Sequence, residues 1–378
     1  MLVKQYNEMH KNNYSDPLTK YFQTKTMQRL KGKGFYCGMD YVGVKSMRPK
    51  EPYTRYDHSF NVGHSAWTFS NDLNIALTGA FHDAGTLDFS HVNSFKKGQG
   101  ATQENDELDV KSVLLKDEEL LTYLREDGIN IDDVCDAEKY PVVDKPHPAL
   151  CLDRADGILS TCLIWAGTHN IEEIRKLYYM LSYLPNIDGM VIDYPSERLI
   201  DLDGNIIFNG ELIIDENSHP EAANYEDFFK AINVYSSILL TKESHYITKV
   251  FGLVLNYYED VKLITESDLF HYSEQEVIER ILDSRYKQVW QDFVNITRVD
   301  YANQNDNDEL IIHDARNKIR YANPLCWAQT GLSEIHGVSK YSYQELNPLE
   351  DAIANIDKPL VGNLSKETSL ILKKYQKR

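Results

Sequence analysis

The alternation of apolar and polar residues along the chain predicts helices over most of its length. Two consecutive helices are expected over residues 55–71 and 72–85, and the second is apolar on nearly all sides, which is typical of a buried helix. A third largely apolar helix is expected over residues 148–167. Longer amphipathic segments are expected to be helical over residues 107–127 and 244–264. The pattern therefore indicates a mainly helical protein with a buried helical centre.

Two short regions favour β-structure instead. Residues 197–218 contain Asp-Gly and Asn-Gly turns between β-favouring runs, which predicts a small hairpin or a three-stranded meander. Residues 308–324 alternate between apolar and polar positions and end at a proline, which indicates a strand pair. Because no internal repeat, low-complexity tract or linker interrupts the chain, a single domain over residues 1–378 is the simplest organisation.

Composition and charge narrow the classes of protein. The chain is 42% hydrophobic and 26% charged, as in a globular protein, and its net charge of −18 disfavours non-specific binding to nucleic acids or anionic membranes. An anionic substrate would need a local basic patch or a metal ion. The five cysteines form no CxxC pair and are expected to be buried free thiols. Since neither a secretory leader nor an 18-residue apolar run is visible, a cytoplasmic location is expected.

Four polar residues stand out because they lie within apolar helices. They are His58, His82, Asp83 and Asp156. A buried carboxylate without a partner costs several kcal/mol, so both aspartates are expected to face a cation. Two imidazoles and two carboxylates form a mixed nitrogen and oxygen ligand set, which suits Mn, Fe, Co, Ni or Zn and also permits Mg.

Three motifs around these residues resemble those of the HD phosphohydrolase superfamily. "TRYDHSFNVGHSA" is similar to the family's "RFEHSLGVG", "GAFHDAGTLDFSH" to its "GLLHDIGHGPFSH", and "CLDRADGILS" to its "ADRLDYL" helix. The resemblance covers about residues 15–166 and is strongest to the branch that contains deoxynucleoside triphosphate triphosphohydrolases. It implies a mainly α HD-domain helical bundle with small β-hairpin insertions. The helical metal-binding core would span about residues 15–170, followed by a helical and β accessory region over residues 171–378.

The resemblance also implies roles for individual residues. His58, His82, Asp83 and Asp156 would ligate a divalent metal, and Asp83 would also orient the attacking water. Arg55 and His91 match residues near the substrate phosphate, so Asp83, His91 and Arg55 are the expected catalytic residues. Asp153, three residues before Asp156, competes for the fourth ligand position. Asp156 is favoured because Arg154 adjoins Asp153 and because the family pattern places the ligand in an Ala-Asp pair.

Departures from the family pattern concern the substrate. Thr86 replaces a histidine and Asp88 a proline, so both are expected to contribute with Arg55 and His91 to substrate binding. If Asp156 is the ligand, the family's phosphate-binding lysine and sugar-binding tyrosine align with Gly157 and Ser160. The nucleotide-contacting glutamine of those enzymes falls at about Phe35. Cleavage of a small phosphate ester, expected to be a nucleotide, is therefore better supported than any one substrate.

Other features leave alternatives open. A catalytically weak or inactive HD-fold protein that binds a nucleotide or a protein partner is the second hypothesis, and relatives in this branch suggest a possible homo-oligomer. His64 is expected to point away from the ligands, and the second His-Asp pair, His313 and Asp314, is assigned no catalytic role. Several lysines could form a phosphate-binding patch, although each alone is more typical of a solvated loop: Lys31, Lys33, Lys96 and Lys97.

Overall fold

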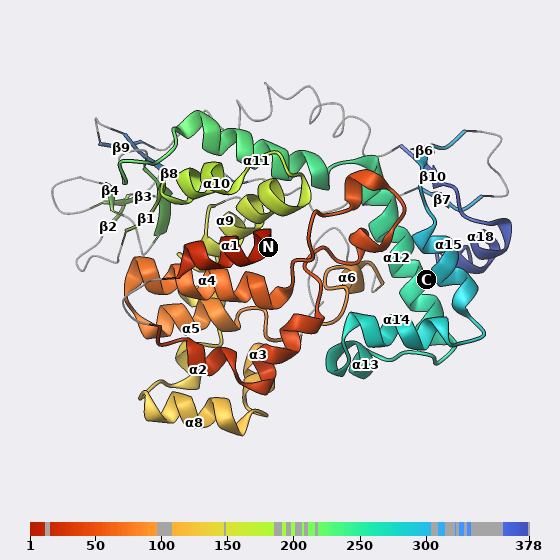
Figure 1. The fold of residues 1–378 in the computed structure, drawn as a ribbon, viewed down its shortest axis with the longest axis horizontal. Helices are drawn as coiled ribbons and strands as arrows, with labels where there is room; N and C mark the ends of the chain where they lie inside the picture. Colours follow the sequence, from red (N-terminus) through yellow and green to blue (C-terminus); the bar gives the residue numbers. More distant parts are fainter. Residues whose placement is uncertain are drawn as a thin grey trace.

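A computed structural model describes most of the chain. The described residues are 1–11, 16–96, 108–146, 149–184, 191–193, 198–200, 206–207, 211–215, 218–303, 309–313, 322, 325–328, 331–333 and 358–376. Within them the protein is mainly helical with small β insertions, which confirms the predicted fold class. The N-terminal half forms one helical group, and the C-terminal helices form a second group on the other side of the view (Figure 1).

A pair of buried helices forms the centre of the N-terminal half. They are α4 (Arg55–Ser70) and α5 (Leu73–Phe81), at the positions that the apolar pattern predicts. The two helices approach closely because glycines face small residues: a Cβ on Gly63 would lie 3.0 Å from the Cβ of Ala80. Helices α1 (Leu2–His10) and α9 (Leu152–Ser160) pack on α4. These four helices surround the polar residues identified in the sequence.

The remaining helices complete two hydrophobic clusters. The smaller cluster includes residues of α2 (Thr19–Phe22), α3 (Lys25–Arg29), α5, α7 (Val110–Leu114) and α8 (Glu118–Glu126). The expected helix over residues 107–127 is thus two helices, because Asp117 caps the start of α8 and also accepts from Thr26. The other helices are α6 (Val92–Lys96), α10 (Ile171–Tyr178), α11 (Tyr225–Leu239), α12 (Lys242–Asp260), α13 (Glu266–His271), α14 (Glu274–Leu282), α15 (Lys287–Val294) and α18 (Lys366–Leu372).

Three small sheets lie at the ends of the helical body (Figure 1). The first sheet has the strand order β1 (Leu181–Leu184), β5 (Glu211–Ile214), β8 (Leu325–Ala328), β9 (Gly331–Ser333). The second has the order β6 (Val299–Tyr301), β10 (Leu360–Gly362), β7 (Ile311–Ile312). The third has the order β2 (Val191–Asp193), β3 (Arg198–Ile200), β4 (Ile206–Ile207). The predicted meander is correct for β3 and β4, whereas β5 pairs with β1 and β8. The side chains of β5 from Leu212 to Ile214 are buried, which favours pairing within the larger sheet.

The second predicted β region also pairs differently. The strand β7 lies within residues 308–324 but pairs with β10, about 50 residues later in the chain, and most of this region lies outside the described residues. Cys37, Cys151 and Cys162 are buried, as expected, whereas Cys135 is partly exposed. Among the helices that the structure describes, none combines the length and apolar character required to cross a bilayer.

Candidate metal centre

Three helices bring the predicted ligands together. His58 lies in the first turns of α4, which begins with a capping box formed by Thr54 and Asp57. His82 and Asp83 directly follow the last residue of α5. The chain turns sharply after them, and a Cβ on Gly85 would collide with the carbonyl oxygen of Leu108. This glycine is therefore required by the close approach of a neighbouring segment.

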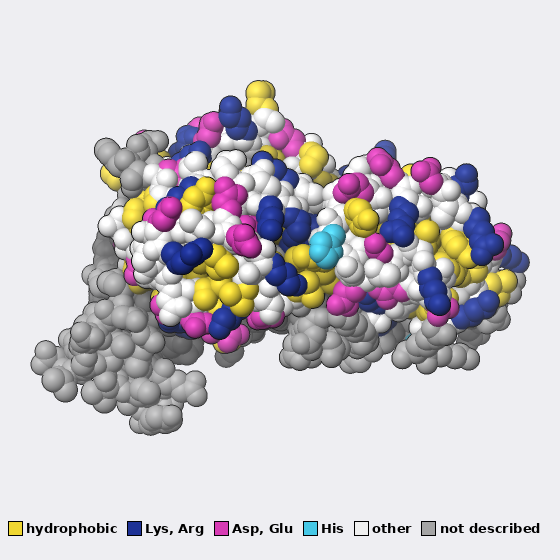
Figure 2. Space-filling view, turned by 90° about the horizontal axis from the view of Figure 1, so that it is seen from below, with side chains coloured by type: hydrophobic (Ala, Val, Ile, Leu, Met, Phe, Trp, Pro, Cys, Tyr) yellow, Lys and Arg dark blue, Asp and Glu magenta, His cyan; other side chains and the backbone are white. Residues whose placement is uncertain are grey.

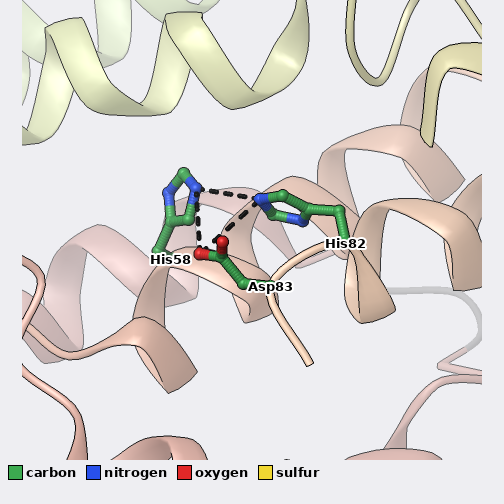
Figure 3. Close-up of side chains that lie close together, drawn as sticks. All are labelled: His58, His82 and Asp83. Carbon is green, nitrogen blue, oxygen red and sulfur yellow. Dashed lines mark hydrogen bonds and ion pairs between the residues drawn. The ribbon is translucent and has the colours of Figure 1, made fainter. Parts of the chain in front are cut away.

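Two imidazoles and a carboxylate converge on one point (Figure 3). The Nε2 atoms of His58 and His82 lie 3.1 Å apart, and Asp83 Oδ2 lies 3.8 Å and 3.7 Å from them, respectively. Metal–nitrogen and metal–oxygen bonds of about 2.0–2.2 Å would place neighbouring ligand atoms roughly 3.0–3.6 Å apart. The distance between the two histidines lies within this range and the two distances to Asp83 slightly exceed it, so a divalent cation would fit between these three side chains after a small shift of Asp83.

The other ring nitrogens explain why the Nε2 atoms face each other. Nδ1 of His82 lies 2.7 Å from the carbonyl oxygen of Gly79, and Nδ1 of His58 lies 2.6 Å from Oδ2 of Asp156. Since both partners accept, each Nδ1 carries the hydrogen and directs the lone pair of Nε2 toward the convergence point. Two lone pairs at this distance repel each other unless a proton or a metal ion lies between them.

The fourth group at this point is Asp153. Its Oδ1 lies 3.0 Å from Nε2 of His58 and 3.8 Å from Nε2 of His82. Asp156, which the sequence pattern favours, lies on the opposite edge of the His58 ring, at Nδ1. That placement is wrong for a ligand, because the carboxylate is separated from His82 and Asp83 by the imidazole itself. The geometry replaces Asp156 with Asp153 and assigns Asp156 to orienting His58.

Charges around the cluster compensate one another. Burial alone would disfavour an ionised Asp83, but the nearby Arg55, His82 and His58 hold the pKa of this carboxyl well below its usual range. Burial likewise opposes a charged His58, yet its hydrogen bonds to Asp153 and Asp156 raise the pKa of this imidazole to about 10. These hydrogen bonds favour a protonated His58 when no metal ion is bound, and a divalent cation would have to displace that proton.

Arg55 lies beside Asp83, and its contact with phosphate stays a prediction. Its Nη1 lies 2.8 Å from Oδ2 of Asp83, its Nε lies 3.2 Å from the hydroxyl oxygen of Ser90, and its side chain is buried. The guanidinium also lies over the ring of Phe35, with 4.9 Å to the centroid. His91 is half-buried in the turn before α6, and its contact with phosphate remains a prediction.

Thr86 and Asp88 do not line an open rim. Both are fully buried, so the predicted role of these side chains in contacting substrate is wrong for this conformation. The hydroxyl of Thr86 donates to Oδ1 of Asp83 at 3.3 Å and thus supports a ligand. Asp88 forms an ion pair of 2.6 Å with Lys33, which is also fully buried and is therefore not part of a phosphate-binding surface patch. Both residues act within the loop after the His-Asp pair.

This loop has unusual backbone conformations. Phe89 and Ser90 have positive φ values of 62° and 41°, which cost energy in residues other than glycine. Glu274, at the start of α14, accepts from the backbone N–H of Phe89 at 3.0 Å and from that of Gly34 at 3.0 Å. The Lys33–Asp88 pair and Glu274 together hold the strained loop against the C-terminal helices.

Several supporting residues have no signal in the sequence. Tyr6 and Tyr53 donate their hydroxyls to the two oxygens of Asp156, at 2.9 Å and 2.7 Å. The chain has 25 tyrosines without an interpretable pattern, and only the fold identifies these two. A second group of potential ligands, Asp144 and Cys151 with the shared Asp153, adjoins the first. The expectation for His64 is consistent with the structure, where its Nδ1 faces the carbonyl oxygen of Phe60.

Comparisons with known proteins give a partial relative and a similar fold. No family model matches the chain. The metal-dependent phosphohydrolase cns2 of Cordyceps militaris is 27% identical over 176 residues, which is 46% of this chain and 48% of that protein. The match thus spans about half the length of the relative. A crystal structure of a hypothetical protein from Aquifex aeolicus superposes with a TM-score of 0.54 at 13% identity and covers 96% of both chains, which shows a shared fold alone.

Proposed function

We propose that this protein is a metal-dependent phosphohydrolase of the HD type that cleaves a small phosphate ester. The observation that carries the proposal is the convergence of the Nε2 atoms of His58 and His82, 3.1 Å apart, with carboxylate oxygens of Asp83 and Asp153 beside them. Hydrogen bonds at both Nδ1 atoms fix this arrangement. Such an oriented ligand set is typical of metal centres and has no role in apolar packing.

The partial relative supports the same reaction class. Its name describes a metal-dependent phosphohydrolase, and the resemblance of the His58, His82 and Asp83 motifs to HD phosphohydrolases agrees with that name. Since the match covers less than half of each chain, it supports the class of reaction and leaves the substrate open.

The residues that would hold the metal are His58, His82, Asp83 and Asp153. When bound there, a divalent cation polarises a phosphoryl oxygen and lowers the pKa of a coordinated water. The mixed donor set suits Mn, Fe, Co, Ni or Zn and also permits Mg. Within the protein, the carboxylate of Asp83 is kept ionised by Arg55, so it is able to accept a hydrogen bond from an attacking water.

Arg55 and His91 are the proposed phosphate-contacting residues. The guanidinium of Arg55 already neutralises Asp83 at the cluster, so an incoming phosphoryl group would meet a buried, fixed positive charge. His91, at the end of the same loop, is the proposed donor to a phosphate or leaving-group oxygen. Neither role needs Thr86 or Asp88, which support the loop from inside.

We propose that the small phosphate ester is a nucleotide. The chain is acidic overall, with a net charge of −18, so an anionic substrate requires local positive charge. On the face shown in Figure 2, Lys and Arg side chains gather beside a histidine between the two halves of the molecule. Such exposed cations would attract an anionic ligand toward this face of an otherwise acidic protein.

A phosphate-release screen tests the proposal. The purified protein is loaded with Mn²⁺, Co²⁺, Ni²⁺ or Mg²⁺ and incubated with nucleoside mono-, di- and triphosphates, and phosphate and triphosphate are both measured. We expect metal-dependent release that is abolished in Asp83→Ala, with unchanged release in His313→Ala, a histidine that belongs to the other His-Asp pair. Stoichiometric metal without turnover would favour the alternative, a non-catalytic HD-fold protein that binds a nucleotide or a partner. Absence of bound metal after reconstitution would refute both hypotheses.

A further inference from the structure

We infer that Tyr6, on the N-terminal helix α1, is a positioning residue of the metal centre and acts through Asp156 and His58. The inference rests on the proposed function and names part of the machinery of that site. Tyr6 is about 50 residues before the first ligand, and no motif in the sequence points to it. Two successive hydrogen bonds connect its hydroxyl to the ligand.

Asp156 is the link between the ligand and the helix. Its Oδ2 faces Nδ1 of His58 at 2.6 Å and accepts from the hydroxyl of Tyr53 at 2.7 Å, while its Oδ1 accepts from the hydroxyl of Tyr6 at 2.9 Å. All four side chains are almost completely buried. Because both oxygens are held, the plane of the carboxylate is fixed, and with it the rotation of the His58 ring.

The two tyrosines are suited to be permanent donors. Burial first, and then the charge of Asp156, raise the pKa of Tyr6 and that of Tyr53 well above their ordinary value, so both hydroxyls keep their protons. Tyr53 is itself fixed by the side-chain amide of Asn61, whose Nδ2 lies 2.9 Å from its hydroxyl. Tyr6 is positioned by α1, and its ring packs edge-on against the ring of His10, with 4.8 Å between the two ring centroids.

Helix α1 is held against the start of α4 at two points. The backbone N–H groups of Leu2 and Val3 donate to the carboxylate of Glu51 at 3.0 Å and 3.1 Å. Directly after Tyr6, Asn7 donates to Oδ1 of Asp57 at 2.7 Å, and Asp57 caps the helix that carries His58. The docking of α1 and the orientation of His58 are thus parts of one hydrogen-bonded arrangement.

The consequence is a measurable effect on metal affinity. In Tyr6→Phe the ring and its packing remain, but Oδ1 of Asp156 loses its buried donor. The carboxylate is then free to rotate, and the His58 ring is oriented less strictly. Loss of outer hydrogen-bond partners weakens metal binding by roughly 10- to 100-fold, and we expect about tenfold for this more distant group.

The experiment compares Co²⁺ binding in the full-length wild type, Tyr6→Phe and the control Tyr178→Phe. Tyr178 is also buried near α1, where its hydroxyl contacts Ser65 at 3.2 Å rather than Asp156. Affinity is measured by competition with a chelator, and the exchangeable Nδ1 proton of His58 is observed in proton NMR spectra of the Co²⁺-loaded proteins. Thermal midpoints of the metal-free proteins show whether each variant keeps the fold.

Tyr6→Phe is expected to bind Co²⁺ about tenfold more weakly and to exchange the His58 Nδ1 proton faster, with Tyr178→Phe like the wild type. Asp156→Asn, as a positive control, should show a larger loss. Wild-type affinity and proton exchange in a folded Tyr6→Phe would overturn the inference while leaving the proposed function intact. If the wild type bound neither Co²⁺ nor Mn²⁺, Ni²⁺ or Mg²⁺, the proposed function would fail, and the positioning role with it.

Discussion

Replacing Lys33 with methionine should strongly destabilise the protein, although Lys33 lies in a segment that the sequence presents as a polar loop. Its Nζ lies 2.6 Å from Oδ1 of Asp88 and donates to the carbonyl oxygens of Leu269 and Tyr272, and neither charged side chain has any exposed surface. Methionine preserves most of the volume of the side chain and removes the charge. The remaining carboxylate of Asp88 would be buried without a counter-ion, and its Oδ2 already lacks a hydrogen-bond partner among the described residues.

The magnitude follows from the charge that is left behind. Breaking a buried ion pair by removing one partner costs about 3–5 kcal/mol. Once Lys33 is removed, Asp88 is able to limit the loss by taking up a proton, because its burial disfavours the charged form of the carboxyl. Keeping an aspartate with an ordinary pKa near 3.9 protonated costs about 1.4 kcal/mol per pH unit, hence about 4 kcal/mol at pH 7 and about 1.5 kcal/mol at pH 5.

The sign of the pH dependence is a second part of this prediction. In Lys33→Met the folded-state pKa of Asp88 lies above the unfolded value, so the penalty is absent below the unfolded pKa and grows as the pH rises. The free energy of unfolding is measured by urea denaturation of Lys33→Met, Asp88→Asn, the double variant and the exposed control Lys31→Met, at pH 5 and pH 7. The double variant should recover most of the loss, because no buried charge remains.

A penalty below about 1 kcal/mol for Lys33→Met at pH 7, or single-variant losses that simply add in the double variant, would refute this reasoning. Addition would mean that the two side chains do not interact energetically. The pair would then contribute nothing specific to holding the loop that follows His82 and Asp83. The control Lys31→Met should stay within about 0.5 kcal/mol of the wild type, since Lys31 is exposed.

Two further predictions concern the metal ligands. Asp153→Asn should no longer bind metal stoichiometrically, as measured by elemental analysis. Asp156→Asn should still bind it, with about 10- to 100-fold weaker affinity in chelator competition. If Asp156→Asn lost the metal and Asp153→Asn kept it, Asp156 would be the ligand instead. Metal affinity should rise about tenfold per pH unit between pH 6 and pH 8, because the pKa of His58 is raised to about 10 and the cation displaces a proton. A metal affinity that does not change with pH in the same competition assay would contradict the displacement of a proton by the cation.

The sequence predicted the parts of the fold that follow from local periodicity. The buried helices α4 and α5 and the amphipathic helix α12 lie where the apolar patterns placed them. Pairing of short strands was less predictable: β5 and β7 find partners about 30 and 50 residues away. Such pairings depend on which apolar surfaces remain exposed after the helices have packed, and a short stretch of sequence does not show this.

The same distinction between local pattern and long-range packing applies to the candidate site. His58, His82 and Asp83 were identifiable because polar residues in apolar helices are conspicuous. Thr86 and Asp88 were misassigned to a substrate rim, since burial in a loop follows no period and depends on segments far along the chain. Asp88 pairs with Lys33, which lies 55 residues earlier in the chain. Lys33 also donates to the carbonyl oxygen of Leu269, which lies 236 residues after it.

The choice between Asp153 and Asp156 could not be made from spacing. Residues three apart on a helix lie about 60° apart around its axis, so both carboxylates of α9 face α4 and both reach His58. An imidazole has two nitrogens on different edges, and only the orientation of the ring decides which carboxylate shares Nε2 with His82. The physical structure is thus a single histidine held between two aspartates, of which one would contact the metal and the other fixes the ring.

This reassignment changes the comparison with the lysine and tyrosine that follow the last ligand in the resembling triphosphohydrolases. With Asp153 as the ligand, the lysine position falls on Arg154 rather than Gly157, so a cation is retained directly after the ligand. The tyrosine position falls on Gly157, where the ring of Tyr235 from α11 lies 3.8 Å from the position that a Cβ would take. Arg154 donates to the carbonyl oxygen of Lys145 at 2.9 Å and lies 3.7 Å from Asp144. The resemblance alone thus keeps a triphosphate in the proposed substrate screen, and Arg154→Ala is the variant that tests whether this cation contacts it.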